Sequence, residues 1–121
     1  MHASKGDLPV QTIGDGYEAR TAEWGDYVAY FERIPGGLDY SAYYENCECP
    51  HWGYVFKGRI RFIYRDGDET VSSGEAYYAP PGHKFEVIED TETIEFSPTV
   101  EYNQHMDKVA RNMQAASTGG D

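Results

Sequence analysis

The segment 59–71 constrains the fold more than any other part of the sequence. Charged and apolar residues alternate over its first half, which places Ile60, Phe62 and Tyr64 on one face of an extended strand. The dipeptide Asp66-Gly67 follows, and such a pair is typical of a hairpin turn because both residues tolerate positive φ values. The pattern predicts an antiparallel hairpin with one apolar face.

The same pattern extends over most of the chain. Further short strands are predicted over 27–34, 38–45, 53–56, 76–79, 84–89 and 93–96. Glycine, proline, aspartate and serine separate them about every eight to twelve residues, which indicates an all-β sandwich or barrel. Only the C-terminal part shows helical spacing, in an apolar stripe of Tyr102, Met106, Val109 and Met113. We therefore expect a flexible arm over 1–16, a barrel over 17–98, a helix over 99–115 and a disordered tail over 116–121.

Length and charge exclude several classes of protein. The 121 residues are enough for one domain with its own core. The net charge of −11 argues against nucleic acid or an anionic membrane as a partner, because both bind clusters of Lys and Arg. No apolar run is long enough to cross a bilayer, and residues 1–7 lack the apolar core of a signal peptide. We expect a cytoplasmic protein in which Cys47 and Cys49 are thiols.

Residues with metal-binding chemistry gather in two segments. The first ends at His51 and also contains Glu45, Cys47 and Cys49, which share one face if the chain is extended. The second is the sequence 80–83, Pro-Pro-Gly-His, which supplies His83. We expect folding to bring these segments together. The two other histidines receive no role: His105 is predicted to lie on the surface of the helix, and His2 lies in the arm.

These segments resemble the two motifs of the cupin family. Cupins carry a glycine, His-x-His, a glutamate and a closing glycine, and later a glycine, a proline, a glycine and a histidine. The second motif matches Gly74, Pro80, Gly82 and His83. The first is degenerate between Gly37 and Gly58, and the positions of its ligands fall on Tyr43, Glu45, Cys47 or His51, depending on which glycine starts the count. The amino-acid sequence over about residues 27–98, plus the helix, is similar to the sequences of a group of small bacterial cupins of largely unassigned function.

The resemblance implies a cupin-type double-stranded β-helix, or jelly-roll barrel, with one C-terminal α-helix. It also implies a divalent transition metal held by His51 and His83 with Glu45, Cys47 or Cys49. Two histidines and a carboxylate suit Fe, Mn or Ni, whereas histidine and cysteine together favour Zn. A small organic molecule would bind inside the barrel in an aromatic pocket, for which the candidates are Tyr43, Tyr54, Phe56, Tyr64, Tyr77, Tyr78 and Phe85.

Three functional hypotheses remain open from the sequence. The first is a metal-dependent enzyme such as a dioxygenase, isomerase or lyase. The second is a metal-free sensor or carrier for a small molecule, because missing histidines are what a lost metal site looks like. The third is a cupin that acts mainly through assembly as a homodimer, formed by the helix and the edge strands.

Overall fold

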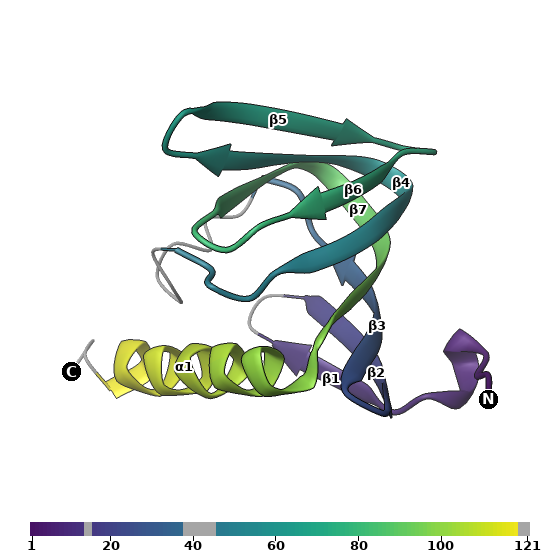
Figure 1. The fold of residues 1–121 in the computed structure, drawn as a ribbon. Helices are drawn as coiled ribbons and strands as arrows, with labels where there is room; N and C mark the ends of the chain where they lie inside the picture. The colour runs from purple at the N-terminus through teal and green to yellow at the C-terminus, as the bar shows by residue number, and fades with distance from the viewer. Residues whose placement is uncertain (14–15, 38–45, 119–121) are drawn as a thin grey trace.

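The computed structural model describes residues 1–13, 16–37 and 46–118. Within these ranges one antiparallel sheet contains seven strands, followed by a long helix, α1 (Thr99–Thr118) (Figure 1). The strands are β1 (Val10–Ile13), β2 (Tyr17–Trp24), β3 (Tyr27–Ile34), β4 (His51–Tyr64), β5 (Gly67–Ser72), β6 (Ala76–Ala79) and β7 (Lys84–Pro98), and a short 3-10 helix, η1 (Lys5–Asp7), precedes them. The strand predicted over 38–45, with Tyr43 and Glu45, lies outside the described residues.

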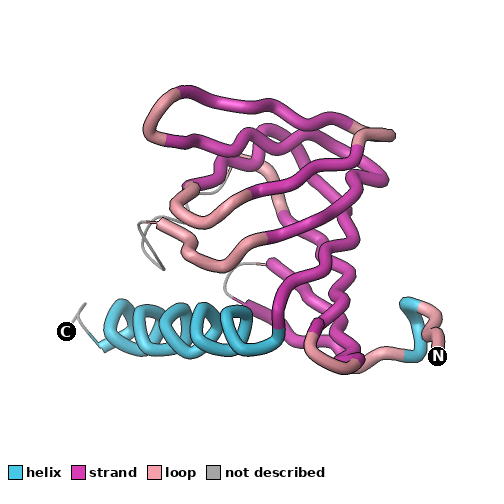
Figure 2. The backbone as a smooth tube through the Cα atoms, viewed as in Figure 1, coloured by secondary structure: helices cyan, strands magenta, loops and turns pink. Residues whose placement is uncertain are grey.

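The order of the strands explains how the sheet closes into a jelly roll. Strands follow the path β1-β2-β3-β7-β4-β5, and β6 pairs with the first part of β4. The long strands β4 and β7 pair along most of their lengths, and β7 also pairs with β3. Both strands bend as they pass from the layer of β5 and β6 to the layer of β1, β2 and β3 (Figure 2). The two layers enclose the core between them.

The sequence predicted breaks in β4 and β7 that the structure does not contain. The segments 53–56 and 59–65 belong to one strand, and so do 84–89 and 93–96. Gly58 adopts a φ of 96°, and the register of β4 on β7 shifts between Val55 and Ile60. A glycine with positive φ can form a bulge that bends a strand without ending it. The turn signals at Gly58 and Asp90 therefore mark bends in continuous strands.

The predicted apolar face of the hairpin is confirmed as the main core. Ile60 and Phe62 are buried, and Tyr64 packs against them. The rest of this cluster comes from the neighbouring strands and consists of Ile34, Val55, Val71, Tyr77, Ala79 and Val87. Burying each of the larger aliphatic or aromatic side chains contributes about 1.5–3 kcal/mol to folding.

A second apolar cluster fixes α1 to the barrel. Tyr102 is buried with Val28, Tyr30, Cys47 and Cys49, and Met106 packs against this group. The rings of Tyr30 and Tyr102 lie 4.8 Å apart. The helix therefore lies against β3 and β7, at the lower edge of the barrel in Figure 1. Among the described residues, no helix combines the length and the apolar character needed to span a lipid bilayer.

Candidate metal centre

Main-chain hydrogen bonds bring the two metal-binding segments together. The amide of Cys47 donates to the carbonyl oxygen of His83 at 2.6 Å, and the amide of Gly82 donates to the carbonyl of Cys47 at 2.8 Å. β4 begins only at His51, and residues 46–50 form bends and a single bridge. The extended strand on which a shared face of 47, 49 and 51 depended is therefore not formed over 46–50, although all three side chains are buried. Pro50 lacks the amide hydrogen that a strand needs for pairing.

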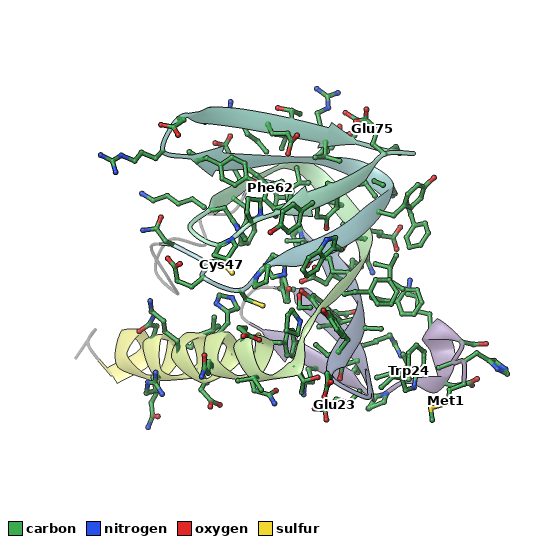
Figure 3. All side chains as sticks on the ribbon, viewed as in Figure 1. Met1, Glu23, Trp24, Cys47, Phe62 and Glu75 are labelled. Carbon is green, nitrogen blue, oxygen red and sulfur yellow. The ribbon has the colours of Figure 1, made fainter. Side chains whose placement is uncertain are left out.

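Three donor side chains converge at this point. One ligand atom from each of Cys47, His51 and His83 can be chosen so that all lie within 4.8 Å of one another, and all three residues are buried. Sγ of Cys47 lies 3.3 Å from Nε2 of His51, and the two imidazole rings are 5.0 Å apart. Figure 3 shows Cys47 between α1 and the layer that contains Phe62. A thiolate and two imidazoles at this spacing match the ligand types of a tetrahedral zinc site.

Hydrogen bonds hold both imidazoles in an orientation that suits metal binding. Nδ1 of His83 lies 2.7 Å from the carbonyl oxygen of Pro80, so Nδ1 carries the proton and Nε2 keeps its lone pair. Nδ1 of His51 lies 2.6 Å from the hydroxyl of Tyr30 and 2.9 Å from Oγ of Ser97. These contacts leave Nε2 of His51 directed toward Cys47.

His105 is a member of this site that the sequence analysis missed. Its Nδ1 and Nε2 lie 3.7 and 3.8 Å from Sγ of Cys47. Burial, reinforced by His51 and His83, lowers the pKa of His105 to about 4. The prediction of a surface position is wrong because residue 105 falls three positions after Tyr102 and four before Val109. This i, i+3, i+7 spacing is that of the apolar stripe and could have identified it.

Cys49 and Glu45 do not join this group in the same way. Sγ of Cys49 lies 3.6 Å from the carbonyl oxygen of Pro50 and faces a separate cavity against α1, lined in part by Glu101 and Lys108. Burial raises the pKa of the Cys49 thiol to about 11. Glu45 lies outside the described residues. Of the two cysteines, Cys47 is therefore the one that the fold places among the histidines.

Two buried glutamates lie behind the imidazole of His51. The carboxylate of Glu95 lies 3.9 Å from Nδ1 of His51, and the hydroxyl of Tyr77 donates to its other oxygen. Burial alone would raise the pKa of Glu95, but His51 and hydrogen bonds from Glu32, Tyr77 and Tyr30 hold that pKa below its usual value. Burial and the adjacent charge of Glu95 raise the pKa of Glu32 well above its usual value. The two shifts favour the anionic form of Glu95 and the protonated form of Glu32, which hydrogen bonds to it.

A small cavity of about 50 Å³ opens beside these groups, with room for a few water-sized molecules. Its lining consists of Tyr17, Tyr30, Glu32, Ile34, His51, Ile60, Phe62, His83, Phe85, Glu95, Tyr102, His105 and Met106. Phe85 is the predicted pocket residue that lines it. Tyr64 and Tyr77 lie just outside the lining, with Tyr64 packed 6.3 Å from the ring of His83.

The remaining predicted pocket residues point the other way. Tyr54, Phe56 and Tyr78 are exposed on the outer face of the sheet, so their assignment to the pocket is wrong. Val55 is fully buried, and the side chains on either side of it in β4 must point outward. The sequence could not show which set faced inward, because apolar residues occupy both faces of this part of β4. Tyr43 lies outside the described residues.

Comparison with solved structures identifies the architecture. A cupin described as RmlC-like from Shewanella frigidimarina aligns with a TM-score of 0.61 at 13% identity, over 79% of this chain and 87% of that chain. KdgF from a Halomonas species aligns with a TM-score of 0.59 at 21% identity, over 78% of this chain and 92% of that one. The chain has the cupin fold. No family model matches the sequence, and no curated protein matches it.

A larger cupin enzyme shares the fold over part of its length. Bacillus subtilis oxalate decarboxylase, in a structure described for its Mn(II) centres, aligns with a TM-score of 0.59 at 17% identity. The match covers 79% of this chain but only 28% of the decarboxylase chain. At these identities the comparisons establish the fold, and the chemistry must be argued from the residues of this chain.

Proposed function

We propose that this cupin binds a divalent transition metal with Cys47, His51 and His83, and that a small organic molecule binds beside the metal in the adjoining cavity. The convergence of these three buried donor atoms carries the proposal. Unpaired buried polar groups are costly, so three of them around one point need a common partner or a shared network of hydrogen bonds.

The chemistry of the donors favours Zn(II) over the other metals. A soft thiolate with two imidazoles is a set that zinc prefers, whereas Mn(II) prefers carboxylate and water ligands. His105 would provide a further nitrogen, since both of its ring nitrogens lie within 3.8 Å of Sγ of Cys47. Burial raises the pKa of the Cys47 thiol far above its usual value, so metal binding must release a proton from it.

The residues around the site have separate tasks in this proposal. Tyr30 and Ser97 orient His51, while the carbonyl of Pro80 orients His83. Phe62 and Phe85 contribute apolar walls that limit the number of waters in the cavity. The metal would supply polarisation of an oxygen of the bound molecule. The neutral carboxyl of Glu32 would hold a proton at the cavity wall.

Metal analysis of protein purified without a histidine tag tests the proposal. After reconstitution with Zn(II) and removal of excess metal, we expect about one equivalent per chain. Cys47→Ala, His51→Ala and His83→Ala should each weaken binding strongly. Cys49→Ala provides the matched control, because its thiol is also buried but lies outside the donor group. Less than about a tenth of an equivalent of Zn(II), Fe(II), Mn(II) or Ni(II) would contradict the proposal.

A metal-free binding protein is the second candidate. It is favoured by the contact of 3.3 Å between Sγ of Cys47 and Nε2 of His51, which satisfies both groups without an ion. In this case His51→Ala would leave the affinity for Zn(II) unchanged. Binding of a small molecule to the chelator-treated protein, with that affinity lost in Phe85→Ala, would support this candidate over the first.

A further inference from the structure

The outer face of the sheet carries six neighbouring aromatic side chains that no part of the proposed site uses. This aromatic face consists of Tyr27, Trp52, Tyr54, Phe56, Tyr78 and Phe96. Trp52 is paired with Phe96 of β7 on one side and with Tyr78 of β6 on the other. The rings of Trp52 and Tyr78 stack at 4.9 Å, and Tyr27 meets Trp52 edge-on at 6.4 Å. The aromatic face is therefore one continuous surface across four strands.

The exposed area of this face is large for a small protein. Each of the six residues is between 39% and 52% exposed. With about 150–250 Å² for a complete aromatic side chain, the six together expose roughly 500 Å². The largest apolar patch on a typical monomer is about 300–600 Å² and is often functional. A surface of this size is therefore a candidate contact surface for a partner.

The composition of the surroundings matches the centre of a protein interface. Most residues that share rows with the aromatic face across the sheet are also uncharged, namely Ala22, Ala29, Phe31, Ile94 and Pro98, and Arg20 enters the row of Tyr54 only at β2, beyond Phe31. This scarcity of charge occurs on a chain that carries 21 acidic and 10 basic residues. Interface cores are depleted in charged residues and enriched in Tyr, Trp and Phe. Nucleic acid and anionic lipid, by contrast, require basic residues at the contact.

We infer that the aromatic face packs against the same face of a second copy of this chain, in a dimer with two-fold symmetry. A standard interface buries about 800 Å² per partner, and the six aromatic residues alone supply more than half of that area. In a two-fold dimer one patch meets its own copy, so a flat apolar face needs no separate complementary surface. Two such sheets pack face to face as in a β-sandwich. The dimer so formed leaves α1 and the metal centre uncovered.

Sedimentation velocity over a range of micromolar concentrations tests this inference. The wild-type protein should sediment as a dimer. Phe96→Glu and Trp52→Glu should be monomers, with the dimer weakened at least about a hundredfold because a charge without a partner would be buried in the interface. Ile88→Glu is the matched control, since Ile88 lies on the same strand as Phe96 and both side chains are 41% exposed. This control should remain a dimer.

Circular dichroism establishes that each variant is folded before its mass is interpreted. If the glutamate variants do not fold, the conservative substitution Tyr78→Ser provides the test, because Tyr78 is 48% exposed and contributes no core packing to the described clusters. A monomeric wild-type protein overturns the inference and leaves a different protein as the occupant of the face. A dimer that Phe96→Glu and Tyr78→Ser leave intact overturns it as well, because the contact must then lie elsewhere.

Discussion

The hydroxyl of Tyr30 lies 2.6 Å from Nδ1 of His51, and this contact directs Nε2 of the imidazole toward Cys47. The same hydroxyl lies 2.8 Å from Oγ of Ser97. A buried tyrosine thus fixes the orientation of a candidate ligand that belongs to a different strand. Partners of this kind typically change metal affinity by about 10- to 100-fold when they are removed.

Tyr30→Phe is therefore expected to weaken Zn(II) binding about tenfold while the protein remains folded. Competition with a chromophoric chelator measures the affinity. Tyr77→Phe is the control, because its hydroxyl donates to the carboxylate of Glu95, whereas the hydroxyl of Tyr30 contacts the ring of His51. Equal Zn(II) affinity in Tyr30→Phe and the wild type would show that this hydroxyl does not orient the ligand.

The two buried glutamates should respond differently to replacement by glutamine. Glu32 is neutral in the folded state, so Glu32→Gln should leave stability at pH 7 unchanged or raise it by about 1 kcal/mol. Glu95 is anionic and accepts several hydrogen bonds, so Glu95→Gln should cost about 2–4 kcal/mol. Urea unfolding measures both. A greater loss for Glu32→Gln than for Glu95→Gln would reverse the assigned protonation states.

The metal-free protein should lose stability as the pH falls below about 6.5, with His105 as one cause. Burial lowers the pKa of His105 from 6.5 to about 4 in the folded state. The unfolded chain therefore binds more protons between these values, and stability declines as the pH falls through this window. His105→Gln should reduce the decline, which urea unfolding at several pH values would measure. An unchanged slope in His105→Gln would contradict the burial of this imidazole. His83, whose pKa is also lowered mainly by burial, should account for part of the remaining slope.

Gly58→Ala should be among the most destabilising small substitutions in the barrel. Gly58 has a φ of 96°, and a Cβ atom would collide with the backbone of Asp90 and Thr91. We expect a loss of about 2–4 kcal/mol, measured by thermal or urea unfolding. Gly74→Ala separates the two causes, because Gly74 also has a positive φ of 87° but has space for a Cβ. A similar loss in both variants would mean that backbone conformation alone accounts for the effect.

Local patterns were sufficient to predict an all-β sandwich or barrel, and the resemblance to cupins specified the jelly roll. Neither predicted the details of the strands. The alternation around Phe62 identified an inward face correctly, because side chains in a strand alternate with a strict period. The same logic failed around Val55, where Tyr54 and Phe56 are as apolar as the buried residue between them. The sequence analysis ended a strand at Gly58, whereas in the structure Gly58 lies at a bend within a continuous strand. A glycine in the sequence is compatible with either a turn or a bulge, so the two cannot be distinguished from it.

The candidate site was predictable only for the residues that lie in the two motif segments. His51, Cys47 and His83 follow from motif positions, and the structure brings them together. Tyr30, Glu32 and Glu95 lie on strands that carry no metal-binding motif, so only the pairing of β7 with both β3 and β4 shows their relation to His51. His105 lies on the same face of the helix as the apolar stripe. Helical spacing predicts that this face is buried, but it does not predict which part of the barrel the face packs against.

The main-chain bridge between Cys47 and His83 separates the position of the centre from the identity of its ligands. The bridge uses the main-chain amide and carbonyl groups of residue 47, and every residue type except proline has both. The side chain at position 47 can therefore change while the main-chain hydrogen bonds to the segment of His83 remain. Replacement by histidine or aspartate there offers a route to shift metal preference toward iron or manganese on an otherwise constant scaffold. In this chain the place of the proposed centre in the fold can therefore stay constant while its donor atom at position 47 is changed.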